Sequence, residues 1–442
     1  MKQASRRNFL RSASGAVAGV AFVPYFGWET KTAANESRSA NDRPLVGCIG
    51  NGGMGSGDAN AISKFGDIVA YCDVDRERSA KLNEKLSGGK GEYFEDYRKL
   101  LDRKDVELVT ISTPDHWHSK IAIDAMRAGK SIYCQKPLTL TIDEGKLLRT
   151  TQKETGCIFQ VGTQQRSDDR FQKAVGLARQ GRIGKIQRVT VAIGGGPKGG
   201  PFPVREVPAN LNWERWLGQA PMTDYIKERC HGEFRWWYEY SGGKLTDWGA
   251  HHVDIAQWGI GMENSGPMSI EVLESEHPVP FVKGYPTVKD SYNTAMTFRI
   301  KVLFSNGVEM IIRDDAKDLG FDNGVLFEGE TGRFFVNRGK LTGEVVEALK
   351  DTPLPDSVMT EIRKGKAKDS HMGNFVACVK DRSTPISDIS THHRILTTCH
   401  LSNIAMRLGR KLQWNPETEQ IVGDEEANAW QKRQQRAGYE IV

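Results

Sequence analysis

The chain has 442 residues, a length that allows two domains, and its net charge at neutral pH is only +5. Acidic and basic residues are interspersed along it, without the clustered basic patch that binds nucleic acid. Composition therefore excludes a nucleic-acid partner and leaves the function to be found in the motifs.

The first residues are typical of an export signal. Ser5-Arg6-Arg7-Asn8-Phe9-Leu10-Arg11 is a twin-arginine element, and residues 12–26 are uncharged but too short for a comfortable membrane span. Thr32-Ala33-Ala34 offers a cleavage site. We expect residues 1–34 to be a twin-arginine signal peptide, the protein to be periplasmic, and membrane contact to run only through this signal. A signal that stays uncleaved and anchors the protein is the alternative.

Strands and helices alternate in the next segment. Strands are predicted at 45–49, 68–72, 107–112, 131–134 and 158–161, and helices near 57–64, 76–86, 118–128 and 142–155. This alternation is typical of a parallel, doubly wound sheet, whose ligands bind beyond the carboxyl ends of the strands. We therefore expect an α/β Rossmann domain over 42–162, with Thr113-Pro114-Asp115 and Gln135-Lys136-Pro137 facing a cofactor.

A glycine-rich turn follows the first strand directly and reads Gly50-Asn51-Gly52-Gly53-Met54-Gly55. Gly50 permits the tight turn, Gly52 lets backbone approach phosphate, and Gly55 lets the next helix pack closely. Asp73 ends the second strand, where an acid accepts hydrogen bonds from ribose hydroxyls and repels a 2′-phosphate. The pattern predicts NAD binding, with NADP disfavoured; an ordinary loop with a surface acid is the alternative.

The pattern changes after residue 185. Strands are predicted at 186–193, 270–277, 291–304, 308–314, 325–330 and 333–336, with Asn306-Gly307 as a hairpin turn. Few helices intervene, so we expect residues 163–442 to form an α+β domain with a large, mostly antiparallel open sheet. Its free face predicts a homodimer or homotetramer. A long insertion rich in Trp, Gly and Pro separates the first two strands.

Four motifs, in order, resemble the family of glucose–fructose oxidoreductase, inositol dehydrogenase and MocA (Gfo/Idh/MocA). They are the glycine loop, Ser112-Thr113-Pro114-Asp115-His116-Trp117-His118, Cys134-Gln135-Lys136-Pro137, and the segment Gly242-Gly243-Lys244-Leu245-Thr246-Asp247-Trp248-Gly249-Ala250-His251-His252-Val253-Asp254. The resemblance covers essentially the whole mature chain and implies an oxidoreductase, but the family is broad in substrate. The chain departs from the family at Gln135, where Glu is usual, so Lys136 lacks a neighbouring carboxylate.

The residues of the last two motifs suit oxidation of a sugar hydroxyl. Removing a hydride from a carbinol carbon also requires a base for the hydroxyl proton, which His251 can supply. Asp247 lies four residues earlier, so on a continuous helix it would share a face with His251 and orient it, or contact the substrate. Lys136 can stabilise the developing alkoxide. The resemblance assigns the same three positions to catalysis; a structural histidine and a surface lysine are the alternatives.

Further residues are expected around these three. Cofactor contacts are expected from the glycine loop, Asp73, Thr113, Pro114, His118, Gln135 and Lys136. Substrate contacts are expected from Arg166, Trp213, Trp236 and His252, although aromatic clusters are also ordinary core and Arg166 could form a salt bridge. His251, His252 and Asp254 beside Asp247 could suggest a metal site, but adjacent histidines on a helix diverge, so we expect none.

Three functions are compatible with this set of residues. The first is an NAD-dependent oxidoreductase that transfers hydride between a sugar hydroxyl and a tightly held cofactor. The second is a redox-neutral enzyme that oxidises a glycoside, eliminates the aglycone from the keto-sugar and returns the hydride. The third is a sugar-binding protein without catalysis, which intact Lys136, Asp247 and His251 argue against.

Overall fold

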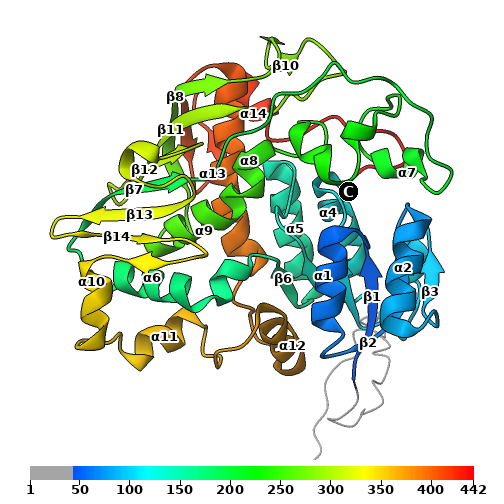
Figure 1. The fold of residues 1–442 in the computed structure, drawn as a ribbon, viewed down its shortest axis with the longest axis horizontal. Coiled ribbons are helices and arrows are strands. Elements are labelled where there is room, and N and C mark those ends of the chain that lie inside the picture. Colours follow the sequence, from blue (N-terminus) through cyan, green and yellow to red (C-terminus); the bar gives the residue numbers. More distant parts are fainter. Residues whose placement is uncertain (1–42) are drawn as a thin grey trace, which may run out of the picture. The chain divides into compact units, whose positions relative to one another are not determined.

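The computed structural model describes residues 43–442 (Figure 1). The predicted signal peptide and its cleavage site lie outside the described residues. Within residues 43–442, no helix combines the length and the apolar character needed to cross a membrane.

Residues 43–162, called the first half below, contain a six-stranded parallel sheet with the strand order β3-β2-β1-β4-β5-β6. Residues 163–442 are called the second half. The strands are β1 (Leu45–Ile49), β2 (Asp67–Cys72), β3 (Glu92–Phe94), β4 (Leu108–Ile111), β5 (Ser131–Cys134) and β6 (Phe159–Val161). The helices between them are α1 (Gly53–Ile62), α2 (Arg76–Ser87), α3 (Tyr97–Leu101), α4 (Asp115–Arg127) and α5 (Ile142–Thr155). The predicted Rossmann topology is confirmed, and its chain order reverses between β1 and β4.

Local sequence explains most of these boundaries. The side chain of Asp75 accepts a hydrogen bond at the start of α2, and Thr141 does the same for α5. Gly88 and Gly156 end these helices in the left-handed conformation. The prediction missed β3, which has only three residues, none of them fully buried. It also started α4 three residues late, because Pro114 at the N-cap position begins the helix at Asp115.

The second half contains a nine-stranded sheet with the strand order β15-β14-β13-β7-β12-β11-β8-β16-β17. Its strands are β7 (Ile186–Ala192), β8 (Pro267–Glu276), β11 (Thr297–Phe304), β12 (Glu309–Arg313), β13 (Gly324–Gly329), β14 (Arg333–Val336), β15 (Leu341–Thr342), β16 (Leu412–Asn415) and β17 (Gln420–Ile421). β9 (Phe281–Val282) and β10 (Tyr285–Pro286) pair separately. Only the β7–β12 pair is parallel, so the expected mostly antiparallel sheet is confirmed.

The strand expected at 291–304 begins only at Thr297. The backbone of the preceding residues bonds to the insertion instead: Tyr292 N–H donates to Gly199 O at 3.0 Å and Asn293 N–H to Trp236 O at 2.9 Å. The hairpin turn at Asn306-Gly307 lies between β11 and β12 as predicted, with a φ of 85° at Gly307.

The expectation of few helices in this half is wrong. One face of the large sheet packs against α6 (Asp169–Arg179), α9 (Gly249–Gly259) and α13 (Ile389–Leu408). The remaining helices are α7 (Trp213–Leu217), α8 (Gly243–Asp247), α10 (Glu344–Glu347), α11 (Asp356–Ile362), α12 (His371–Asp381) and α14 (Glu425–Ala429). Every residue of α9 and most of α13 are buried, so neither helix has the polar face that makes a helix visible as a periodic pattern.

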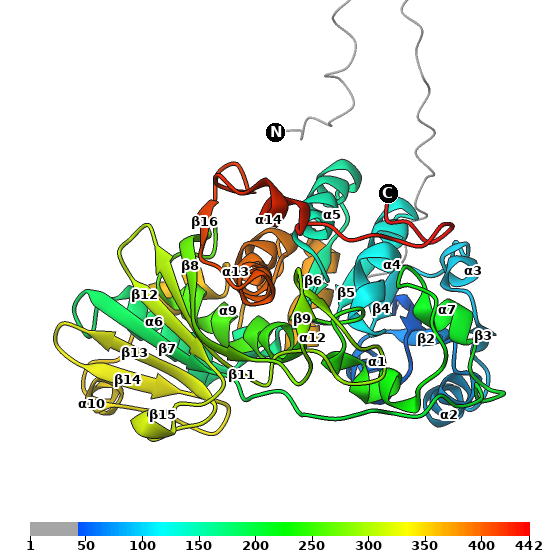
Figure 2. The same cartoon turned by 90° about the horizontal axis from the view of Figure 1, so that it is seen from above.

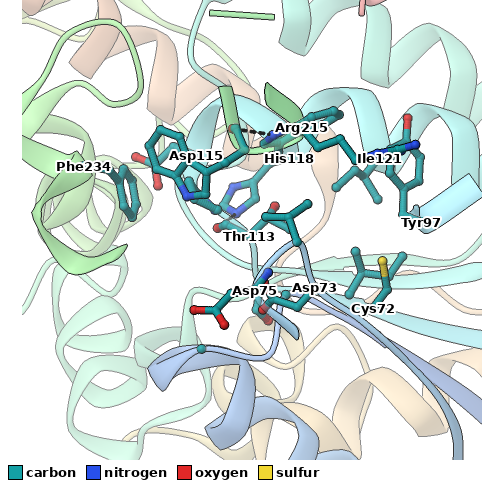
Figure 3. Close-up of a pocket in the computed structure, with 18 of the residues that line it drawn as sticks. Cys72, Asp73, Asp75, Tyr97, Thr113, Asp115, His118, Ile121, Arg215 and Phe234 are labelled. Atoms are coloured by element: carbon teal, nitrogen blue, oxygen red, sulfur yellow. Dashed lines mark hydrogen bonds between the residues drawn. The ribbon is translucent and has the colours of Figure 1, made fainter. Parts of the chain in front are cut away.

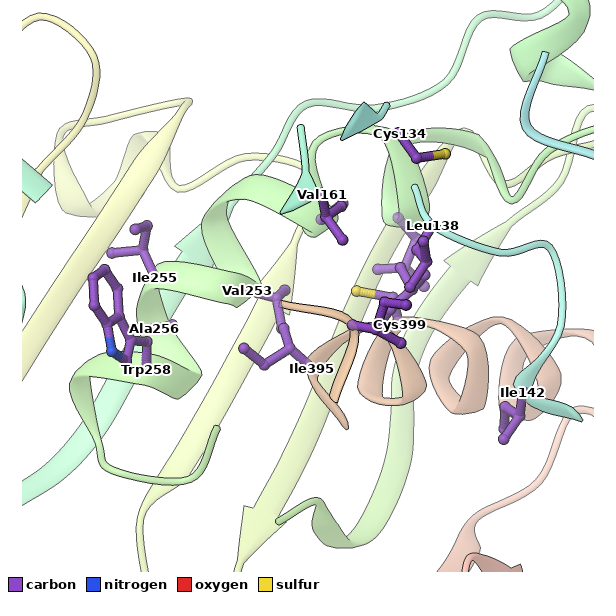
Figure 4. Close-up of a cluster of buried hydrophobic side chains, with 14 of the residues drawn as sticks. Cys134, Leu138, Ile142, Val161, Val253, Ile255, Ala256, Trp258, Ile395 and Cys399 are labelled. Carbon is purple, nitrogen blue, oxygen red and sulfur yellow. The ribbon is translucent and has the colours of Figure 1, made fainter. Parts of the chain in front are cut away.

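Helix α13 joins the two halves (Figure 2), because it packs on α9 and β8 on one side and on α5 on the other. Cys134, Leu138 and Val161 of the first half accordingly share one hydrophobic core with Val253 and Ile395 (Figure 4). The shared core fixes the carboxyl end of β5 against α8 and α9. The proposed division into 42–162 and 163–442 stays a prediction.

Candidate active site

The glycine loop has the backbone shape that a dinucleotide phosphate requires. Gly50 has a φ of +82°, and the backbone of Ser112 and Thr113 leaves no room for a Cβ there. A Cβ on Gly55 would overlap the carbonyl oxygen of Gly50, so α1 can start this close to the loop only with glycine. The first N–H groups of α1 are thereby directed at the space above the loop.

Asp73 lies at the end of β2 beside this loop. Its carboxylate accepts the N–H groups of Asn51 at 2.7 Å and Asp75 at 2.9 Å. Burial raises its pKa, whereas those two hydrogen bonds and the charge of Arg78 oppose the rise. The Asn51 side chain is turned inward and donates to Cys72 O and Ser79 Oγ. Asn51 therefore holds the loop to β2 rather than lining the pocket.

A pocket extends from the glycine loop along the carboxyl ends of β2, β4 and β5 (Figure 3). Its floor includes Gly50, Gly52, Gly53, Met54, Asp73, Thr113, Pro114, His118, Gln135 and Lys136. The opposite wall comes from the insertion, with Arg215 and Phe234, and from the end of the sequence, with Gly438 and Tyr439. Most of the predicted cofactor residues thus surround one cavity; Asn51 and Gly55 shape it from behind.

His118 fixes the start of α4 against both neighbouring strand ends. Its Nδ1 lies 2.7 Å from Pro137 O and its Nε2 lies 2.9 Å from Thr113 O. Burial lowers its pKa to about 4, so the ring is neutral and donates to one of the two carbonyls. His118 positions the segment that carries Lys136.

Lys136 and Asp247 form a half-buried ion pair at the end of the pocket. The ammonium donates to the Asp247 carboxylate and, at 3.2 Å, to the Asp247 backbone oxygen. Arg235 Nε donates to the same carboxylate at 3.4 Å. The charges of Lys136 and Arg235 oppose the effect of burial and hold the pKa of Asp247 below its usual range. Asp247 is therefore an anion that holds the Lys136 ammonium in place.

His251 lies one turn further, on α9. It is 5% exposed, and its Nδ1 has no hydrogen-bond partner among the described residues. Burial and then the charge of Lys136 lower its pKa well below the usual value, so the imidazole is neutral and able to accept a proton. The continuous helix expected from Asp247 is interrupted at Trp248, and the carboxylate of Asp247 is held by Lys136 and Arg235. The expected orientation of His251 by Asp247 is not found.

Asp115 is a second carboxylate of the pocket wall, and Figure 3 places it near Phe234. It is 3% exposed and accepts a hydrogen bond from Ser241 Oγ at 2.5 Å. Burial raises its pKa to about 7, although Arg235 and Lys136 act in the opposite direction. The sequence placed Asp115 beside the cofactor but gave no sign of this pKa, which depends on the insertion that covers it.

Comparison with known proteins gives the family. Residues 45–163 match the Gfo/Idh/MocA oxidoreductase family, NAD-binding Rossmann fold, and residues 200–441 match its C-terminal alpha/beta domain. The chain belongs to the Gfo/Idh/MocA oxidoreductase family. The resemblance noted in the sequence is thereby confirmed, and NAD is the cofactor.

Several Gfo/Idh/MocA relatives are similar over most of their length. Myo-inositol 2-dehydrogenase of Thermotoga maritima is 24% identical over 306 residues, which are 68% of this chain and 77% of the relative. The NAD⁺-dependent scyllo-inositol 2-dehydrogenase of Bacillus subtilis is 25% identical, with 72% and 80% covered. The WlbA dehydrogenase of Bordetella pertussis, solved with NADH and UDP-GlcNAcA, has the same fold, with a TM-score of 0.59 at 17% identity over 85% of this chain and 99% of that one.

Gln135, where the Gfo/Idh/MocA signature usually has glutamate, is hydrogen-bonded to a neighbouring acid. Gln135 Nε2 donates to both carboxylate oxygens of Asp58 on α1, at 3.0 and 2.9 Å. Ser112 Oγ donates to the same carboxylate at 2.7 Å, and burial raises the Asp58 pKa to about 6. A glutamate at position 135 would face Asp58 as a second acid, so the neutral amide suits this pair. The carboxylate partner that Lys136 was expected to lack is supplied by Asp247.

Four predicted substrate residues lie outside the pocket wall. Arg166 is 1% exposed and forms a buried ion pair with Asp254, with both N–O distances at 2.8 Å. Trp213 stacks on Trp216 in the core of the insertion. His252 is fully buried, with Nε2 2.9 Å from Asn323 Oδ1, and Trp236 Nε1 donates to Glu233. The structure places Arg166, Trp213 and His252 in the protein interior and Trp236 at a half-buried position, so their substrate contacts stay predictions that the geometry does not support.

Asp254 forms an ion pair with Arg166, so its carboxylate is not free to bind a metal ion beside His251 and His252. Within residues 43–442, no group of three or more His, Cys, Asp or Glu side chains is arranged to hold a metal ion.

Replacing Asp73 by alanine is expected to narrow the preference for NAD over NADP. The carboxylate is positioned to accept ribose hydroxyls, so its loss should weaken NAD binding by about 10- to 100-fold. NADP should lose less, because its 2′-phosphate is no longer repelled and Arg78 stays nearby. Calorimetric titration of the cofactor-free protein measures both affinities. Asp67→Ala is the matched control, since Asp67 is an exposed aspartate at the other end of β2 that pairs with Arg43 and lies outside the pocket. Tighter binding of NADP by the unmodified protein would contradict the assignment.

Asp115→Asn is expected to remove a pH dependence of stability. The folded protein holds the Asp115 proton up to about pH 7, whereas an unfolded aspartate releases it near pH 4. The folded state therefore binds more protons in this window, and stability falls as the pH rises through it, by up to about 4 kcal/mol. Asparagine has no proton to release and keeps a partner for Ser241. The melting temperature of the variant should exceed that of the unmodified protein more at pH 8 than at pH 5. Asp102→Asn, at an exposed aspartate, is the control, and parallel pH profiles for Asp115→Asn would refute the expectation.

Proposed function

We propose that the protein is an NAD-dependent oxidoreductase that transfers hydride between a sugar or polyol hydroxyl and a tightly held cofactor. The observation that supports this most directly is the Lys136–Asp247 pair, with neutral His251 beside it, at the end of the dinucleotide pocket. The inositol dehydrogenases among the relatives act, by their names, on cyclic polyols, which have the same secondary hydroxyl groups.

Each of these side chains has a separate role at the reacting hydroxyl. When bound, NAD supplies the acceptor for the hydride of the carbinol carbon. His251 accepts the hydroxyl proton, because its imidazole is neutral and its Nδ1 has no hydrogen-bond partner among the described residues. Lys136 donates to the same oxygen and stabilises its developing negative charge. Asp247 fixes Lys136 and, with Arg235, keeps the ammonium aimed at one place.

Enclosure of the pocket supports retention of the cofactor. Arg215 of the insertion bonds to Asp96 at 2.8 Å and to Glu95 at 3.2 Å, across the pocket from the glycine loop. Tyr439 Oη donates to Glu214 at 2.6 Å and so fastens the end of the sequence to the insertion. A dinucleotide bound beneath these contacts can leave only after they open, which slows its dissociation.

The test is turnover without added cofactor. Protein purified by gentle lysis is incubated with sugars, inositols and glycosides, while the absorbance of bound NADH is followed and products are analysed by mass spectrometry. Formation of a keto-sugar together with NADH is the expected result. Release of an aglycone without net NADH would instead identify the redox-neutral glycoside-cleaving reaction. Binding of sugars without either product would refute both reactions.

We propose that the protein forms a homodimer or homotetramer through the outer face of the large sheet. This face has ion pairs such as Lys301 with Glu271 at 3.4 Å, and Leu303 on β11 is 43% exposed. Light scattering at micromolar concentration should give two or four copies, and Leu303→Glu should lower that number. Leu319→Glu is the control, because Leu319 is 42% exposed but ends the short 3₁₀ helix Lys317–Leu319 and is not part of a strand of the sheet. A monomeric unmodified protein would contradict the proposal.

The twin-arginine element supports a further proposal, that the folded protein is exported to the periplasm. Replacing Arg6 and Arg7 by lysine should then leave the protein in the cytoplasm. Recovery of the unmodified protein from the cytoplasm alone would rule this out.

A further inference from the structure

A cluster of positive charge surrounds the reacting end of the site. Arg235 belongs to the 3₁₀ helix His231–Trp236, Lys244 to α8, and Arg338 to the turn between β14 and β15. Two neighbouring segments and the distant turn that carries Arg338 thus each bring a cation close enough to act on the carboxylate of Asp247, as does Lys136.

The carboxylates that face this cluster do not balance it. Four cations, namely Lys136, Arg235, Lys244 and Arg338, face Asp247 and Asp115, which leaves a net charge of +2 when both acids are ionised. Asp168 also acts on Arg338, but it is bonded to Arg170 at 2.8 Å.

Lys244 and Arg338 have no ion-pair partner in the part of the chain that the structure describes. Aromatic rings hold them instead: the Arg338 guanidinium carbon lies 4.6 Å and Lys244 Nζ lies 5.9 Å from the ring centroid of Trp248. Lys244 Nζ is also 5.8 Å from the Trp236 ring centroid. A ring face fixes a cation without neutralising it, so both charges remain available to a ligand.

The phosphates of the cofactor do not neutralise Lys244 and Arg338. The pyrophosphate site is the glycine loop, and neither Lys244 nor Arg338 belongs to the wall of the dinucleotide pocket. They lie around the ring of Trp248, which follows Lys244 by four residues and precedes His251 by three. Arg338 is exposed and Lys244 is half-buried, so a ligand arriving from solvent can reach both side chains.

We propose that the substrate is an anionic saccharide, whose carboxylate, phosphate or sulfate group binds between Lys244 and Arg338. Its reacting hydroxyl lies at Lys136 and His251. This inference rests on the proposed function and names the substrate class for the same site. Arginine and lysine together suit such an oxyanion, because the guanidinium offers paired donors and the ammonium a compact charge.

The test is a binding titration that does not require turnover. The intrinsic tryptophan fluorescence of the NAD-loaded protein is titrated with matched sugars in the gluco, galacto and manno configurations. Each configuration is offered as the neutral hexose, the uronate, the 6-phosphate and the 6-sulfate. We expect at least one anionic member to bind about 10-fold or more tightly than its neutral counterpart, with an affinity that falls as salt is added. Comparing the uronate, the 6-phosphate and the 6-sulfate shows which of the three anionic groups the site prefers.

Variants connect that preference to the two cations. Lys244→Met and Arg338→Met should each weaken binding of the preferred anion by about 10-fold and reduce its salt dependence. Lys340→Met is the matched control, because Lys340 lies on the same turn as Arg338 and rests on a different ring, that of Phe335. Neutral sugars that bind as tightly as their anionic partners in all three configurations, or variants that keep the preference, would overturn the inference. If only neutral sugars are turned over, the anionic substrate is refuted and the proposed oxidoreductase activity stands. If anionic sugars bind but no sugar is turned over, the oxidoreductase activity is refuted and the anion site stands.

Discussion

Replacing His251 by alanine is expected to lower the rate of hydride transfer by about 10²–10⁴-fold, because the hydroxyl proton loses its acceptor. Cofactor binding should persist, since His251 lies outside the wall of the dinucleotide pocket. Single-turnover reduction of bound NAD, followed across pH with the most active sugar, measures the effect.

His252→Ala is the matched control for this prediction. The two histidines are adjacent on α9, but His252 is fully buried against Asn323, so its loss should alter stability more than the rate of the folded enzyme. A His251→Ala variant with near-normal rates at all pH values would place the base elsewhere, with Asp115 the next candidate because of its pKa of about 7.

Lys136→Met is expected to lower the same rate by about 10²–10³-fold, through lost stabilisation of the alkoxide. Methionine keeps much of the side-chain volume, so the fold and NAD affinity should change little. Asp247 would lose the partner that does most to lower its pKa, and the pKa of this carboxyl should rise. The single-turnover rate and a calorimetric NAD titration test the two parts separately.

Lys120→Met controls for the removal of any positive charge from the pocket. Lys120 lines the same pocket, but it pairs with Asp124 at 3.0 Å. The double variant with His251→Ala should be less impaired than the product of the single effects, because both residues act on one proton transfer. Strict multiplication of the two effects would indicate that Lys136 and His251 serve different steps.

The Rossmann half could be predicted closely because its signals are local. Alternating strands and helices, the glycine loop and Asp73 each follow from a few consecutive residues. The buried helices α9 and α13 could not be found this way, since a helix covered on all sides has no periodic polar face. The start of β11 was likewise decided by bonds to the distant insertion.

The candidate site, like the fold, could be predicted from the sequence only in part. Lys136, Asp247 and His251 were found from motifs, but the partner of each depends on tertiary packing. Asp247 pairs with Lys136 and Arg235 rather than with His251, because the packing of β5 and the insertion brings these two cations to its carboxylate. Arg166 pairs with Asp254, 88 positions later in the chain, a distance that no spacing rule covers. The acid opposite Gln135 is Asp58, whose role only the packing of α1 on β1 and β4 reveals.

The far wall of the dinucleotide pocket has a consequence for biosynthesis. The glycine loop leaves the ribosome early, whereas Gly438 and Tyr439 emerge only after residues 56–437 have been made. A nascent Rossmann half can therefore hold NAD only in an open groove, from which it exchanges freely. Durable capture of the cofactor therefore requires that Tyr439 has been made and has reached Glu214.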